Sequence, residues 1–193
     1  MAGRIKGVAL RELVAWYERD RGRAALLDAL ERVPPDLRAR FDLEREALGV
    51  LAATWYEARL VHALLDAMVH GLDPEARRRL AYDGSVAAMR ATLGGVHRAV
   101  LRIVGSPELH AKFGQRMWRT YFEDGIADSR RVDAHTHRLA FRQWHSHHPV
   151  LCDMVTASDL VVFPAMGLHG VTVEQLSCVD RGDSECAHFI RWT

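Results

Sequence analysis

The chain has 193 residues, of which 49% are hydrophobic and 26% are charged, and its formal net charge is +1. This length suits one domain with a sizeable core, so we expect a single domain over residues 1–193. A net charge near zero argues against a nucleic-acid-binding protein. No apolar run is long enough for a membrane span, and the N-terminus lacks the apolar core of a signal peptide. Three cysteines in such a chain predict a reducing, cytoplasmic location.

Residues 1–124 have the apolar periodicity of helices, and we interpret them as the helical part of the domain. Helices are expected over residues 8–22, 24–33, 54–70, from Asp73 onward, and 106–125. Thr54 is the expected N-cap of the third helix. Asp73-Pro74 opens the next helix in the favoured order of cap and proline. Gly84 and Gly94-Gly95 are expected to break the segment that follows.

Residues 125–193 change to a strand pattern. Strands are expected over residues 126–132 and 135–144, then a helix over 149–168, then a β-hairpin over 171–192. The element order of this part is therefore ββαββ. Together with the first part it predicts an α+β fold, in which an N-terminal helical layer packs on an antiparallel sheet of about four strands.

All three cysteines lie in the last quarter of the chain, at positions 152, 178 and 186. If the hairpin loop is Arg181 to Asp183, Cys178 and Cys186 lie directly opposite each other. Their Cα atoms would then be about 4.5–5.5 Å apart, close enough to share a metal or to form a disulfide. Spacing alone thus points to a site without saying what the site serves.

Several short motifs resemble a paralogous family that is abundant in myxobacteria. They are Ile5-Lys6-Gly7, Pro34-Pro35-Asp36-Leu37, Thr54-Trp55-Tyr56, the segment 118–125, and the ending from Cys178 through Gly182-Asp183 and Cys186 to Trp192. That family in turn looks like the 4-vinyl-reductase domain group. The group shares its fold with haem-based nitric-oxide sensors, aromatic-sensing domains of transcription activators and a subunit of the TRAPP complex. The resemblance implies a domain that binds a small hydrophobic ligand or a partner protein, often as a homodimer.

The same resemblance implies a structural zinc. In the aromatic-sensing domains, zinc is held by one cysteine, a glutamate and two cysteines eight residues apart. Cys152, Cys178 and Cys186 match this pattern, but Gln175 stands where the glutamate is expected. The fourth ligand could be Glu174 beside it, or instead His169, His188 or Asp180. Buried reduced thiols and a disulfide or redox pair remain alternative interpretations of the three cysteines.

Eleven histidines invite a second metal hypothesis. His135 and His137 share one face of the expected strand, and His145, His147 and His148 follow directly before Pro149. A solvated strand end and loop would look the same. Haem needs an axial ligand in an apolar pocket, and because no histidine stands out for that role we do not expect haem.

The helices also carry aromatic residues that could line a ligand pocket or simply form core. They are Trp55, Tyr56, Phe113, Trp118, Tyr121 and Phe122. No nucleophile with a base at a telling spacing is found, so we do not expect an enzyme. The sequence thus favours a non-enzymatic sensor or adaptor domain for a small hydrophobic ligand or a signalling partner. The alternatives are a metal- or haem-binding protein that uses the histidine cluster, and an assembly module without ligand.

Overall fold

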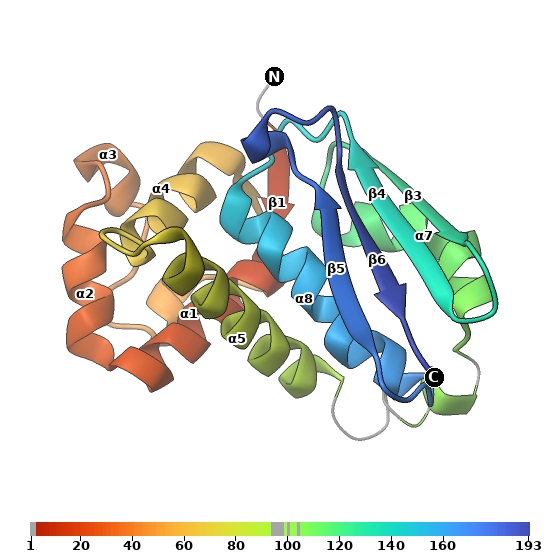
Figure 1. Ribbon diagram of the computed structural model, residues 1–193. Helices are drawn as coiled ribbons and strands as arrows, with labels where there is room; N and C mark the ends of the chain where they lie inside the picture. The colour runs from red at the N-terminus through yellow and green to blue at the C-terminus, as the bar shows by residue number, and fades with distance from the viewer. Residues whose placement is uncertain (1–2, 94–98, 100, 104) are drawn as a thin grey trace.

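The computed structural model describes residues 3–93, 99, 101–103 and 105–193. Its N-terminal part contains β1 (Arg4–Lys6), α1 (Gly7–Arg21), α2 (Arg23–Glu31), α3 (Pro35–Arg38), the 3-10 helix η1 (Glu46–Gly49), β2 (Trp55–Glu57), α4 (Ala58–Met68), α5 (Pro74–Thr92) and α7 (Pro107–Tyr121). The first two helices and the restart of a helix at Ser106-Pro107 agree with the sequence analysis. Figure 1 shows α1 to α5 on one side of the molecule, whereas α7 lies beside β3 and β4.

The helix expected from Thr54 begins later, at Ala58. Trp55–Glu57 instead form the short strand β2, which pairs antiparallel with β1 in a two-stranded sheet, with Ile5 opposite Tyr56. The side chain of Ile5 is buried. The sequence analysis missed the strand β2 because its partner β1 lies far away in the sequence, and no local pattern of residues indicates such a pairing.

Gly84 does not break a helix, contrary to expectation, but lies inside α5. A Cβ atom built on it would come within 2.6 Å of Leu13 and 2.8 Å of Trp16, both on α1. The glycine therefore permits close packing of α5 on α1. The expected N-cap of α5 is confirmed, because the Asp73 carboxylate accepts a hydrogen bond from the Ala76 amide at 2.8 Å. The break expected at Gly94-Gly95 lies outside the described residues.

The C-terminal part contains β3 (Ile126–Arg131), β4 (Thr136–Arg142), α8 (Pro149–Ala165), β5 (Thr172–Ser177), the 3-10 helix η2 (Val179–Arg181) and β6 (Cys186–Arg191). The four strands form one antiparallel sheet in the order β3-β4-β6-β5. The α+β class is therefore confirmed. The final hairpin turns through η2 and Gly182, whose φ is +88°, and not through a three-residue loop.

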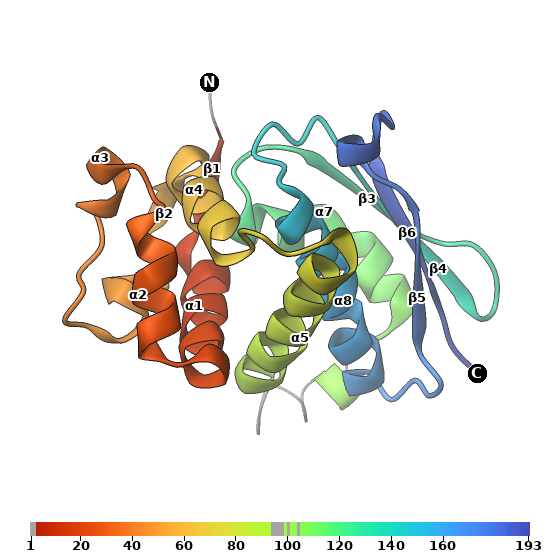
Figure 2. The ribbon, with the colours of Figure 1, turned by 60° about the vertical axis from the view of Figure 1, so that its left-hand side comes forward.

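Helices α7 and α8 lie on one side of the sheet, and in Figure 2 no helix of the described residues covers its other side. Helix α5 packs along α8, and α1 packs along α5, so the helices form successive layers in front of the sheet. An aromatic cluster joins α7 to the sheet, with Trp118 stacked on Phe122 and on Phe141 at centroid separations of 4.2 and 4.4 Å. Among the helices in the described part of the chain, none is long and apolar enough to cross a membrane.

Candidate functional site

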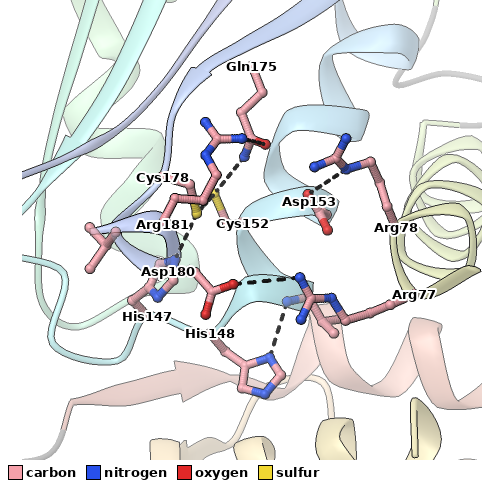
Figure 3. Close-up of polar contacts among 12 residues, drawn as sticks. Arg77, Arg78, His147, His148, Cys152, Asp153, Gln175, Cys178, Asp180 and Arg181 are labelled. Carbon is pink, nitrogen blue, oxygen red and sulfur yellow. Dashed lines mark hydrogen bonds and ion pairs between the residues drawn. The ribbon is translucent and has the colours of Figure 1, made fainter. Parts of the chain in front are cut away.

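Four potential metal ligands meet where the hairpin reaches α8. The ligand atoms of His147, Cys152, Cys178 and Cys186 all lie within 4.8 Å of one another. The three cysteines are buried and reduced, and His147 is half-buried. Figure 3 shows three of them, His147, Cys152 and Cys178, between the hairpin, the loop before α8 and α8 itself.

Each ligand comes from a different place in the fold. Cys152 lies in the first turn of α8, and the neighbouring Cys178 and Cys186, together with burial, raise the pKa of its thiol. Cys178 follows the end of β5, and Cys186 begins β6. His147 lies in the loop between β4 and α8. The fold therefore closes the cluster from one helix, one loop and both sides of the hairpin.

Hydrogen bonds fix the loop that presents His147. The Asp124 carboxylate accepts a hydrogen bond from the Ser146 amide at 2.8 Å, and Trp144 donates its indole N–H to the Ser146 hydroxyl at 3.0 Å. Gln143 bends the chain with a φ of +52°, a conformation that few residues other than glycine adopt. The position of His147 therefore depends on contacts from a distant loop.

The distances suit a tetrahedral metal. The Cys178 sulfur lies 3.7 Å from the sulfur of Cys152, from the sulfur of Cys186 and from Nε2 of His147. A tetrahedron with metal–sulfur bonds of about 2.3 Å has edges of about 3.8 Å. A disulfide would need its sulfurs at about 2.05 Å, so none of these pairs is bonded.

The four groups affect one another's protonation, and polar contacts reach the sulfur atoms: Cys152 and Cys186 lower the pKa of the Cys178 thiol. Burial alone would lower the pKa of His147, but the neighbouring Cys178 and Cys186 outweigh it and raise that pKa to about 9. The Val179 amide points at the Cys186 sulfur and the Gln175 amide at the Cys152 sulfur, each at 3.4 Å. Such N–H groups orient and stabilise sulfur ligands around a metal.

Two arginines of α5 flank the cluster. Arg77 lies 3.6 Å from Asp180 of η2, and Arg78 lies 3.7 Å from Asp153, the residue after Cys152 (Figure 3). Asp153 is buried, and burial raises the pKa of its carboxyl. These ion pairs tie α5 to the two segments that carry the cysteines.

The structure does not bring the fourth ligands proposed from sequence to the three cysteines. Glu174 is exposed and forms an ion pair with Arg191 on the neighbouring strand. His169 is exposed near the end of the chain, and Nε2 of His188 is bonded to Asp159 at 2.7 Å. Asp180 pairs with Arg77. His147 takes the place instead, and the signal for it was its closeness in sequence to Cys152.

The histidines do not form one cluster. His135 and His145 are exposed, whereas His137 is wholly buried and bonds the Ser129 hydroxyl at 2.8 Å. His148 accepts a hydrogen bond from the Val150 amide at the start of α8, and its Nε2 lies 3.0 Å from Asp66. The sequence hypothesis of a single histidine metal site is therefore wrong, because the loop and strand send these side chains in different directions.

A separate cavity lies between the helical layers and the sheet. Its volume is about 190 Å³, and residues of α1, α5, α7, α8, β3 and β4 line it. Most of the lining is apolar and includes Met89, Met117, Leu139, Phe141, Met154 and Val162. Met117 is also 40% exposed, so the cavity reaches the surface there.

His110 of α7 is the histidine that lines this cavity in the described part of the chain. It is buried, and burial lowers its pKa, so the ring is neutral at neutral pH. Its Nδ1 lies 3.2 Å from the Ser129 hydroxyl, while within the described residues Nε2 has no hydrogen-bond partner. A neutral imidazole held through one nitrogen is the form that binds metals through the other.

Three of the six aromatic residues proposed as a pocket line the cavity, namely Trp118, Tyr121 and Phe122. The other three do not. Phe113 is 40% exposed on the outer side of α7. Trp55 and Tyr56 belong to β2, where Lys6 covers the Trp55 ring and the Tyr56 hydroxyl accepts a hydrogen bond from the Leu51 amide. The sequence analysis did not predict that α8 lines the cavity, because the apolar residues of this helix have the pattern of ordinary core residues.

Comparison with known proteins identifies the fold. No family model and no curated protein sequence matches the chain. Among solved structures, an Fe(II) unliganded H-NOX protein from K. algicida is similar, with a TM-score of 0.70 and 11% identity over 98% of this chain and 97% of that one. An H-NOX protein from S. oneidensis in the Fe(II)NO ligation state has a TM-score of 0.68 and 13% identity over 98% and 99% of the two chains. At this identity the likeness shows an H-NOX-like fold.

A third similar structure comes from work on haem distortion in the H-NOX family, with a TM-score of 0.57 and 12% identity over 98% and 95% of the two chains. These neighbours contradict the expectation, drawn from the sequence, that the protein does not bind haem. That expectation rested on finding no suitable histidine in the sequence. The structure now presents His110 in an apolar cavity, which is the setting that an axial ligand requires.

Proposed function

We propose that this protein is a sensor domain that binds a small apolar ligand in the cavity between its helical layers and its sheet. The cavity itself carries the proposal. Its volume of about 190 Å³ exceeds the roughly 150 Å³ of an apolar cavity that takes up benzene. Support also comes from the H-NOX-like fold, since one neighbour was solved with NO bound to its iron.

Helix α8 offers a route from the cavity to the surface of the domain. Leu151 and Met154 line the cavity, and Cys152 between them belongs to the metal-ligand cluster. A ligand that displaces α8 would therefore move the loop and hairpin attached to it. A partner protein that recognises this end of the molecule could read the change.

A cavity-filling variant tests the proposal. Ala88 is buried on α5 and lines the cavity, whereas Ala91 is exposed on the same helix. Wild type and the control Ala91→Phe should bind ethylbenzene in calorimetric titrations, and Ala88→Phe should not. Equal binding by all three proteins would place any ligand elsewhere, and no binding by wild type would refute the proposal.

A second candidate function is haem-dependent sensing, which the position of His110 favours. Haem would supply an iron that binds a diatomic gas, and His110 would hold that iron through Nε2. The cavity is smaller than the roughly 300–1,000 Å³ of pockets for larger ligands, so haem would require lining side chains to move. Met89, Met117 and Met154 are flexible enough to do so.

Haemin titration separates this candidate from the first. If haem binds through His110, wild type develops a Soret band that shifts on adding NO, and His110→Ala loses the ligand-dependent shift. His145→Ala, which changes an exposed histidine, should behave as wild type. A spectrum that His110→Ala leaves unchanged would count against His110 as the ligand.

We further propose a structural zinc held by His147, Cys152, Cys178 and Cys186. The support is the 3.7 Å spacing around Cys178 and the donor set of three thiolates and one imidazole, a common zinc combination. Protein purified without chelator should contain about one zinc per chain. Cys178→Ser should lose it, and a zinc content near zero in wild type would contradict the site.

The remaining expectations stay predictions. They are the resemblance to the myxobacterial family and the 4-vinyl-reductase group, the absence of enzymatic activity, the cytoplasmic location, the homodimer, and docking of a signalling partner. An assembly module without ligand is the outcome that the ethylbenzene titration would favour if wild type failed to bind.

A further inference from the structure

From the polar groups that line the cavity, we infer that its ligand is a small apolar amine. This inference rests on the proposed function, because it specifies the ligand of the same cavity. The charged side chains in the lining are Glu12 of α1 and Asp159 of α8. No arginine or lysine of the described residues lines it. The cavity is therefore apolar with an acidic edge, which attracts a cation and repels an acid.

Asp159 is the better placed of the two carboxylates. Its side chain is 5% exposed, and its Oδ2 atom accepts a hydrogen bond from His188 at 2.7 Å. The other oxygen, Oδ1, has no hydrogen-bond partner within the part of the chain that the structure describes. Asp159 lines the cavity, so its carboxylate belongs to the cavity wall. A buried acceptor of this kind gains most from a charged donor.

Three hydroxyl groups of the lining cannot supply that donor. Ser85 donates to the Met154 carbonyl at 2.6 Å, Ser158 to the Val155 carbonyl at 2.6 Å, and Thr92 to the Ala88 carbonyl at 3.0 Å. Their hydrogens are committed to helix backbone, and only oxygen lone pairs remain for a ligand. Apart from His110, whose Nε2 can donate or accept, and the hydroxyl of Tyr121, the lining thus offers acceptors. A ligand that brings its own donor matches this set of groups.

The volume limits the apolar part of the ligand to about one ring. A cavity of about 150 Å³ holds benzene, and this one has about 190 Å³. A protonated amine on a single aromatic ring or a short aliphatic chain satisfies both the volume and the free carboxylate oxygen. Glu12, half-buried on α1, adds negative charge on the other side of the cavity.

Three probes of matched size test the inference: benzylamine, ethylbenzene and benzoate, each titrated calorimetrically into the full chain at neutral pH. Benzylamine should bind about tenfold more tightly than ethylbenzene or better, because a hydrogen bond to a charged group contributes at least that factor. Benzoate should bind most weakly. Asp159→Asn retains an acceptor for His188, and should lose the preference for benzylamine while keeping its affinity for ethylbenzene.

The outcomes separate the two proposals. Ethylbenzene that binds as tightly as benzylamine, or benzoate that binds more tightly, would overturn the amine while leaving the cavity as a ligand site. A preference for benzylamine that Asp159→Asn and Glu12→Gln both leave intact would also overturn it. Binding of none of the three probes would refute the ligand cavity and the amine together.

Discussion

At the scale of residues, His147 decides whether three thiols can complete a tetrahedral site. Its Nε2 lies 3.7 Å from the Cys178 sulfur, and its ligand atom lies within 4.8 Å of those of all three cysteines. The spacing of Cys178 and Cys186 in the sequence was enough to predict that they lie close together. The spacing of His147 was not enough to predict that it joins them, because a bend at Gln143 and a hydrogen bond from Ser146 to Asp124 set the direction of its side chain.

Replacing His147 should therefore weaken zinc binding more than replacing its neighbours. We expect His147→Ala to lower zinc affinity by more than about a hundredfold, because loss of even an outer hydrogen bond to a ligand costs about tenfold to a hundredfold. Competition with a chromogenic chelator measures this. His145→Ala and Glu174→Ala are matched controls that should bind zinc as wild type does. Weaker binding in Glu174→Ala than in His147→Ala would contradict the assignment.

His137 should make the protein less stable in acid. Its ring is wholly buried, and burial together with His110 lowers its pKa from about 6.5 to about 4. The unfolded chain therefore binds more protons between these values, so stability is full above pH 6.5 and falls as the pH drops toward 4. Near pH 4, the free energy of unfolding is lower by about 3 kcal/mol than at pH 7 because of this histidine.

A variant isolates this contribution. His137→Gln does not titrate and can still bond Ser129. Urea unfolding at pH 7 and near pH 4 should show a smaller loss of free energy of unfolding for the variant than for wild type. An equal loss in both proteins would show that His137 is already protonated in the fold, or that its burial is not as described.

At the scale of elements, the helix boundaries illustrate what a sequence can and cannot predict. Asp73-Pro74 and Ser106-Pro107 carry their signals locally, and both mark helix starts in the structure. The start of α4 was misplaced because Trp55–Glu57 are held as a strand by β1, a long-range pairing. The cavity was predicted in its general place, whereas its wall on α8 depends on which apolar residues leave space unfilled, and no pattern encodes that.

Gly84 gives an element-scale prediction. Glycine in a helix normally costs about 1 kcal/mol relative to alanine, so Gly84→Ala would be expected to stabilise α5 if it were isolated. Because the new Cβ would meet Leu13 and Trp16 of α1 below 3 Å, we expect a net loss of about 1 kcal/mol or more. Chemical denaturation measures it, and the exposed neighbour Asp83→Ala is the control that should not destabilise. A gain in stability for Gly84→Ala would show that α1 and α5 are not packed closely.

The hairpin of β5 and β6 should depend on zinc. Zinc bound at the proposed site would connect Cys178 and Cys186 to α8 and to the loop before it, so its removal would release both sides of the hairpin. After chelation, hydrogen exchange should accelerate at the ends of β5 and β6 and in the first turn of α8. Exchange in α1 and α2, which lie on the far side of the helical part from the hairpin in Figure 1, should stay unchanged. Uniform acceleration over the chain would mean that zinc maintains the whole fold.

At the scale of the whole molecule, two centres share one helix. α8 contributes Cys152 to the proposed zinc site and several side chains to the cavity, and it lies between α5 and the sheet. The H-NOX-like architecture explains this arrangement, since helical layers in front of a one-sided sheet leave space at their junction. The metal site would then hold the sheet end of the domain while the cavity responds to ligand.

The central claim is that a small apolar ligand occupies the cavity between α5, α8 and the sheet. A crystal structure of the protein soaked with bromobenzene tests it most directly, because the anomalous signal of bromine locates the ligand without prior assumptions. We predict one strong bromine peak among Ala88, Phe141 and Met154. Bromine found only on the surface, with the cavity filled by protein side chains, would contradict the account.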